Sequence, residues 1–157
     1  MSRTLALALL LAAPCAQAVT TCRVISGNGL AFGSYDLLSA APSDTQATVT
    51  VQCDRIGGPA TVSLLVRIDP GANGSSAQAR RMRQAGGASL LAYNIYRDPN
   101  RSSVWGDLDG IDTVGASLTV PDRGSAAVQL TLYGRMPPRQ NAAVGSYTAA
   151  LQLTILY

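Results

Sequence analysis

The chain of 157 residues fits one folded domain. It has no histidine, all 12 basic residues are arginine and all 9 acidic residues are aspartate. This composition excludes a Ser–His or Ser–Lys catalytic pair and a histidine-ligated metal site. The formal net charge of +3 is small and scattered along the chain, which argues against a nucleic-acid partner. Acid–base chemistry by two aspartates, as in a glycosidase, is the remaining enzymatic alternative, but no spacing picks out a pair. We therefore expect a protein that is not an enzyme and that binds no cofactor.

Residues 1–18 have the layout of a secretory signal peptide. Arg3 supplies the positive charge, residues 5–13 form a short apolar run, and the segment ends in the small-x-small sequence Ala-Gln-Ala. The apolar run is too short to cross a bilayer, so we expect no membrane span. The sequence predicts an exported chain with one domain over residues 19–157.

The cysteines of the chain are interpreted on the expectation that it is exported. Cys22 and Cys53 remain after signal cleavage, and an even pair in an exported protein predicts a disulfide. Two buried free thiols are the alternative. Cys15 falls inside the signal segment, where a lipid-anchored cysteine is a further alternative that the preceding Pro14 argues against.

Apolar and polar residues alternate along several short segments, as they do in strands with one buried face. Lysine and glutamate, two good helix formers, are absent, while 15 glycines and 8 prolines indicate many turns. In chain order we expect strands over 22–25 with 30–32 as one interrupted strand, 47–53, 60–68, 80–83 as a short edge strand, 90–96, 117–120, 127–133 and 145–157. This pattern predicts an all-β sandwich of about seven antiparallel strands.

The last of these segments, residues 145–157, has the longest alternating pattern. Its apolar face carries Leu151, Leu153, Ile155 and Tyr157, and the opposite face is mostly polar. A long apolar strand needs neighbours on both sides, because an exposed edge invites pairing with another strand. The sequence therefore raises the question of which strand pairs with its second side.

A group of aspartates is the one candidate metal site. Asp107, Asp109 and Asp112 lie close together, and clustered carboxylates can hold Ca²⁺. Their spacing does not follow the EF-hand pattern, however, and aspartates in loops commonly cap turns. We therefore expect turn capping, with calcium binding as the alternative.

A group of arginines is the one local basic cluster. Arg80, Arg81 and Arg83 could bind an anionic surface or a polysaccharide. Charged residues on an exposed edge strand also protect a sheet against aggregation, and we prefer this interpretation.

Several short motifs occur along the chain in a fixed order. They are Cys22, Leu-Ala-Phe-Gly-Ser-Tyr-Asp at 30–36, Val-Thr-Val-Gln-Cys at 49–53, Arg-Met at 81–82, 91–98, Val-Trp-Gly-Asp at 104–107, Tyr-Gly-Arg-Met-Pro at 133–137, and Gly-Ser-Tyr at 145–147 with the final Tyr157. Each motif is weak by itself. Together they resemble the spore coat protein U domain family, which includes subunits of Csu-type archaic chaperone–usher pili, over the whole of residues 19–157.

The resemblance implies an incomplete immunoglobulin-like sandwich whose C-terminal strand lacks a neighbour. A periplasmic chaperone would cover the gap first, and in the fibre a strand from the next pilin subunit, delivered by an outer-membrane usher, would fill it. The protein would then reach the cell surface through the periplasm as part of a fimbrium. The resemblance places Leu151, Leu153 and Ile155 on the floor of the groove, with Leu30 and Phe32 on the facing side, and we expect Tyr157 to belong to the groove as well.

The sequence departs from rod subunits of such fibres in one respect. Rod subunits carry a donor segment of about a dozen residues before the first cysteine, enough for an inserted strand. Here Val19-Thr20-Thr21 stand between the expected cleavage site and Cys22. We therefore expect a subunit at a fibre end that accepts a strand and offers none. The alternative is a self-contained secreted adhesin or surface-binding module that completes its own sheet.

Overall fold

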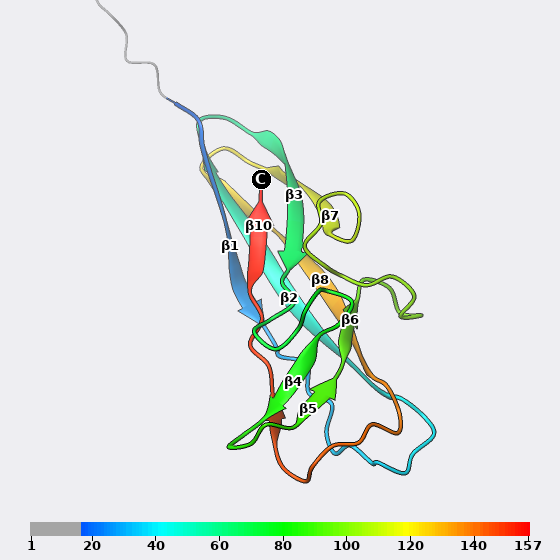
Figure 1. Cartoon of the computed structure of the whole chain (residues 1–157). Coiled ribbons are helices and arrows are strands. Elements are labelled where there is room, and N and C mark those ends of the chain that lie inside the picture. The colour runs from blue at the N-terminus through cyan, green and yellow to red at the C-terminus, as the bar shows by residue number, and fades with distance from the viewer. Residues whose placement is uncertain (1–16) are drawn as a thin grey trace, which may run out of the picture.

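The computed structural model describes residues 17–157, which form ten antiparallel β-strands in three sheets (Figure 1). Most of the expected signal peptide, residues 1–16, lies outside the described residues. Within the described part of the chain, no helix is long and apolar enough to cross a membrane.

The largest sheet, sheet A, has four strands in the order β1-β2-β8-β6. Their bounds are Val19–Gly27 for β1, Ser43–Ile56 for β2, Gly124–Met136 for β8 and Asn94–Tyr96 for β6. The long strands β2 and β8 pair along their length, from Ser43 opposite Met136 to Arg55 opposite Gly124. This pair spans the molecule and forms one layer of the sandwich.

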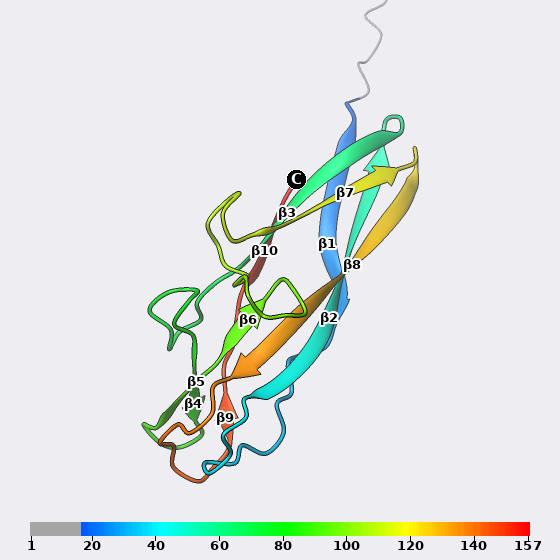
Figure 2. The same ribbon diagram turned by 90° about the vertical axis from the view of Figure 1, so that its right-hand side faces the viewer.

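Two three-stranded sheets lie toward opposite ends of the β2–β8 pair (Figures 1 and 2). Sheet B has the order β10-β3-β7, with bounds Leu153–Leu156 for β10, Ala60–Ile68 for β3 and Val114–Val120 for β7. Sheet C has the order β5-β4-β9, with bounds Leu90–Ala92, Arg81–Gln84 and Tyr147–Thr148. The C-terminal segment therefore contributes an edge strand to each of these sheets.

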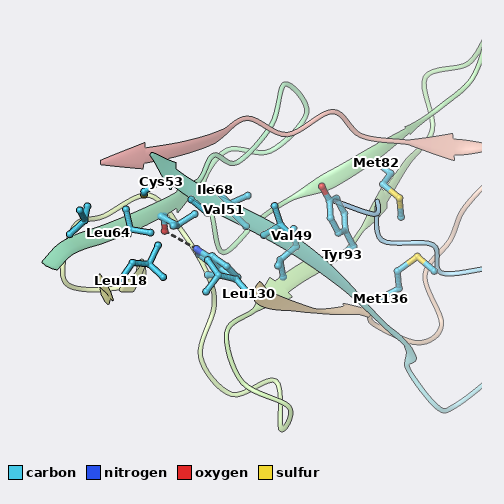
Figure 3. Packing of buried hydrophobic residues seen from close by; sticks show 14 of the residues in the cluster. Val49, Val51, Cys53, Leu64, Ile68, Met82, Tyr93, Leu118, Leu130 and Met136 are labelled. Atoms are coloured by element: carbon cyan, nitrogen blue, oxygen red, sulfur yellow. Dashed lines mark hydrogen bonds between the residues drawn. The ribbon is translucent and has the colours of Figure 1, made fainter. Parts of the chain in front are cut away.

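The core forms where the inward faces of sheets A and B meet (Figure 3). Strand β2 contributes Val49, Val51 and Cys53, and the facing strand β3 contributes alternate residues from Val62 to Ile68, all buried. Trp105 is fully buried beside them, and its indole nitrogen donates to the Val66 carbonyl at 2.9 Å. Removal of these alternating apolar side chains from water stabilises the sandwich. The predicted all-β fold class is confirmed, because the described residues form antiparallel sheets and no helix.

The strands agree with the sequence-based expectation most closely in the middle of the chain. Strand β3 has the predicted bounds, while β2 and β8 extend further than expected. The single strand expected over 90–96 is wrong, because the chain leaves sheet C at Tyr93 and enters sheet A as β6. The prediction that residues 30–32 continue the first strand is also wrong, because these residues belong to no strand.

The prediction that residues 80–83 form an exposed edge strand is wrong. Strand β4 is the middle strand of sheet C, and Arg80, which precedes it, has no exposed surface. Its guanidinium donates hydrogen bonds to the carbonyls of Ile68 (2.7 Å), Asp69 (2.9 Å) and Ala77 (3.1 Å) and to Oδ1 of Asn94 (2.9 Å). Burial lowers its pKa from the ordinary value. Arg80 therefore joins β3 to β6 in the interior, and only Arg81 and Arg83 are left on the surface.

Surface ion pairs and turn caps make the fold sensitive to acid. Arg135 bonds Asp44 and Arg67 bonds Asp109, and each guanidinium holds the pKa of its carboxyl below 3.8. Two backbone N–H groups lower the pKa of Asp122 in the same direction. Since these folded-state pKa values are depressed, the stabilisation is fully present above the unfolded pKa and is lost as pH falls from there through the lower folded pKa.

We therefore expect the thermal midpoint to be nearly constant between about pH 5 and 8, where histidine would titrate if there were any, and to fall below about pH 4. Melting curves followed by circular dichroism across this range test the prediction. A midpoint that instead rose on acidification would contradict it.

Candidate functional site: an uncovered groove between the two chain ends

The first strand and the last strand each have an edge with no neighbour among residues 17–157. Strand β1 pairs only with β2, and β10 pairs only with β3. Both strands lie on the same side of the molecule (Figure 1). The two layers of the sandwich therefore end in free backbone edges on one side.

The inward side chains of these edge strands are more exposed than the residues they pair with. Val24 of β1 lies opposite Val51 and shares its face, yet Val24 is 43% exposed and Val51 is fully buried. In the other layer, Leu153 lies opposite Ile68, which is 2% exposed, while Leu153 itself is only partly buried. The interior of the sandwich is therefore left uncovered along this side, where one more strand would close it.

A groove follows the uncovered side. Its first part, of about 430 Å³, lies between the end of β1 and the segment leading to β10. Its second part, of about 540 Å³, continues toward the loop before β9. Leu30, Phe32, Met82 and Tyr147 line both parts. We call this surface the edge groove, and its walls are residues 27–37 on one side and 142–153 on the other.

Beyond Gly27, which ends β1, the first wall belongs to no sheet, and side chains of β2 hold its backbone. Thr45 Oγ1 donates to the Ala31 carbonyl at 2.8 Å, and Ser43 Oγ donates to the Phe32 carbonyl at 3.3 Å. The hydroxyl of Tyr35 donates to the Pro137 carbonyl at 2.6 Å. These bonds take the place of a strand ladder and fix the wall without adding a strand.

The ring of Phe32 packs directly over Gly134 of β8. A side chain on Gly134 would approach Phe32 Cζ to 2.8 Å, so the glycine makes room for the ring. The ring meets Tyr93 edge to face, with centroids 6.0 Å apart and an interplanar angle of 71°. Phe32 and Tyr93 therefore form part of the floor of the edge groove.

The second wall is the C-terminal segment, which changes sheets along its length. Strand β9 pairs with β4, residues 149–152 pair with no strand, and β10 then pairs with β3. At the crossing, Asp69 holds Gln152 through two bonds, from its backbone N–H to the Gln152 carbonyl (3.1 Å) and from the Gln152 N–H to its carboxylate (2.8 Å). The single strand expected over 145–157 is therefore two short strands joined by an anchored bend.

The residues predicted to form the groove fall into two groups. Leu30, Phe32, Leu151 and Leu153 line the edge groove. Ile155 lies further along β10, partly buried against the core. Tyr157 is 57% exposed and follows the end of β10. The sequence pattern places Ile155 on the same inward face as Leu153, and its partner in β3, Val66, is fully buried.

Met82, Tyr93 and Tyr147 are among the further lining residues that sequence reasoning missed. The signal for Tyr93 was present, since it alternates with Leu91 and Ile95 on one apolar face. Nothing in the local pattern indicated that the chain crosses between sheets there. Met82 and Tyr147 come from strands too short to give a periodic signal.

The predicted disulfide is present. Cys22 and Cys53 are directly opposite in the β1–β2 ladder and are bonded to each other. The free-thiol alternative is therefore wrong. The bond ties β1, most of whose residues are exposed, to a buried position of the central strand β2.

The aspartate cluster is engaged in local contacts. Asp112 is buried, and its carboxylate accepts from the Leu108 N–H at 2.8 Å and from the Gln78 amide at 3.3 Å. Asp109 pairs with Arg67 of β3. Residues 17–157 contain no group of three or more His, Cys, Asp or Glu side chains placed to hold a metal ion.

Comparison with known proteins decides the family. The Spore Coat Protein U domain matches residues 6–154. The chain belongs to the Spore Coat Protein U domain family. This family is associated with pilus-type and coat-type surface structures, and it is linked to chaperone–usher assembly. A curated relative, "Protein U" of Myxococcus xanthus, is 32% identical over 147 aligned residues, which cover 87% of this chain and 77% of the relative. The family predicted from the ordered motifs is therefore confirmed.

Proposed function

We propose that this protein is a structural, non-enzymatic subunit of a cell-surface fibre and that its edge groove accepts a β-strand from a neighbouring subunit. The observation that carries the proposal is the pair of unpaired backbone edges, β1 and β10, with partly exposed apolar residues between them. An added strand would satisfy the free backbone groups of β10 and cover Val24 and Leu153 in one step.

The dimensions of the groove suit a single strand. Its second wall extends over residues 142–153, so a strand lying alongside it needs about a dozen residues. Alternate side chains of that strand would point between Phe32 and Leu151 toward the floor, and the intervening side chains would face solvent. The edge groove therefore favours a partner with alternating apolar residues. Ile155 and Tyr157 would extend the contact beyond the groove.

The family's link to chaperone–usher assembly supports an assembly route. We propose that residues 1–18 direct export to the periplasm, that a chaperone strand covers the edge groove there, and that an outer-membrane usher exchanges it for the strand of a neighbouring subunit. The apolar groove supports this route, because a surface of this kind left open invites aggregation.

The position in the fibre is the finer part of the proposal. Residues Val19 to Thr21 already pair with Ile56, Arg55 and Asp54 in the β1–β2 ladder. They are therefore not free to act as a donor arm, which favours a place at a fibre end. Mass spectrometry of the mature N-terminus tests this part, and a mature chain with a long arm ahead of Val19 would contradict it.

The test of strand acceptance uses residues 19–157 produced without a chaperone. The probe is a 13-residue strand peptide with valine at odd positions and threonine or lysine at even positions, and the control is a scrambled peptide of the same composition. We expect the protein alone to be monomeric only when dilute and to self-associate on gel filtration at high concentration, and we expect the strand peptide to keep it monomeric there and raise its melting temperature. A stable monomer with one cooperative melt that ignores both peptides would instead favour a self-contained adhesin.

A further inference from the structure

Two exposed arginines of sheet C are not accounted for by the fold. Arg81 and Arg83 flank the buried Met82 in β4, so both side chains lie on the outer face of the sheet. Arginines on an edge strand protect a sheet against aggregation, but β4 is the middle strand, between β5 and β9. Protection of an edge therefore does not explain why two cations stand at these positions.

No carboxylate balances these two charges. Within residues 17–157 neither arginine makes an ion pair, whereas four arginines elsewhere in the chain do. The nearest aspartates in the sequence are Asp69 and Asp98, and the carboxylates of both accept hydrogen bonds from backbone N–H groups. Residues 70–97 and 123–157, which supply all three strands of sheet C, contain no acidic residue. The outer face of this sheet is therefore open to an anionic partner.

The two guanidinium groups stand beside a shallow apolar strip. The Nε of Arg83 donates to the Gly87 carbonyl at 3.2 Å, which orients the guanidinium and leaves its two terminal nitrogens free for a ligand. Arg81 lies two residues further along the same face, at a distance of about 7 Å. Leu90 and Ala92 of β5 are directly opposite Arg83 and Arg81, share their face, and are partly exposed.

We propose that the outer face of sheet C binds an acidic polysaccharide, with polymer carboxylates at Arg81 and Arg83 and sugar rings over Leu90 and Ala92. The planar guanidinium matches a carboxylate in two parallel hydrogen bonds, and the C–H faces of sugar rings pack on apolar side chains. Nucleic acid fits this face less well, because the strands of sheet C place no aromatic side chain there on which bases could stack. A lipid surface also fits less well, because the face offers no fully exposed large apolar side chain for insertion.

This binding goes beyond strand acceptance and is separate from it. Arg81 and Arg83 line neither part of the edge groove. A strand lying in the groove would leave both guanidinium groups exposed. A fibre subunit could therefore hold its neighbour and a surface polysaccharide at the same time.

The experiment titrates an oligogalacturonate, which carries one carboxylate per sugar, against labelled protein that is kept dilute, and follows binding by thermophoresis. The variant Arg81→Gln/Arg83→Gln is compared with Arg23→Gln/Arg123→Gln, which removes the same two charges toward the other end of the β2–β8 pair. We expect the sheet C variant to lose about tenfold or more in affinity and the control to stay within about twofold of wild type. Arg81→Lys/Arg83→Lys keeps the charge and should recover only part of the loss. All variants should melt at the wild-type temperature.

The outcomes test the polysaccharide assignment and keep it apart from the proposed function. A polyglutamate peptide of equal length and a short DNA duplex should bind more weakly than the oligogalacturonate, and equal binding of either would overturn the assignment. Failure of the oligogalacturonate to bind wild type, or an equal loss in both double glutamine variants, would overturn the inference as a whole. The strand peptide should bind Arg81→Gln/Arg83→Gln with wild-type affinity. If that peptide does not bind wild type, the proposed function fails while the polysaccharide site stands.

Discussion

Replacing Cys22 and Cys53 together by alanine is expected to lower the free energy of unfolding by about 3–4 kcal/mol. The disulfide closes a loop with a sequence separation of 31, and its loss gives conformational entropy back to the unfolded chain. The effect should be large here because β1 has little burial of its own to hold it on the sheet. Denaturant unfolding of the variant and the wild type measures the difference.

The same variant also probes the groove, because β1 leads into its first wall. If β1 frays from β2, residues 28–32 lose the strand that anchors their N-terminal end, and the strand peptide should bind more weakly, even at temperatures well below the melting point. The matched control is Val24→Ala, which removes partly exposed apolar atoms from the same strand without removing the cross-link. A double cysteine variant that is no less stable than Val24→Ala would refute the idea that the disulfide holds β1.

The sequence predicted best those strands whose partners do not change along their length. Strand β3 has its predicted bounds because Gly57-Gly58-Pro59 and Asp69-Pro70 end a clean alternating run on both sides. The run 90–96 alternates just as well, yet it contains two strands in different sheets. Alternation records only which face is buried, and both halves of this run face the same core.

The candidate site was predictable in part, because alternation along the sequence shows which face of a segment is buried. The C-terminal alternation identified Leu151 and Leu153 as inward residues, although the backbone partner changes from β4 to β3 between 148 and 153. Arg80 could not be placed, because its burial depends on carbonyls and an amide brought together by the fold. A free edge is likewise a property of sheet order and leaves no mark in the local sequence.

Leu30→Asp is expected to weaken binding of the strand peptide by about 100-fold or more while leaving the unliganded protein folded. Leu30 is partly buried and lines both parts of the edge groove, in a segment that belongs to no strand. With the groove open, water can still reach a carboxylate at this position. Once a strand covers the groove, that carboxylate is desolvated without a partner, and the penalty of several kcal/mol exceeds the roughly 2.7 kcal/mol that a 100-fold loss requires.

Leu38→Asp is the matched control, since it makes the same chemical change at a residue that is 89% exposed and does not line the groove. Titration calorimetry with the strand peptide should give wild-type affinity for Leu38→Asp and no measurable heat for Leu30→Asp. Equal affinity of the two variants would place the accepted strand somewhere other than the edge groove. The two variants have the same net charge, and neither residue lies in a strand. A difference between them is therefore attributable to desolvation in the groove.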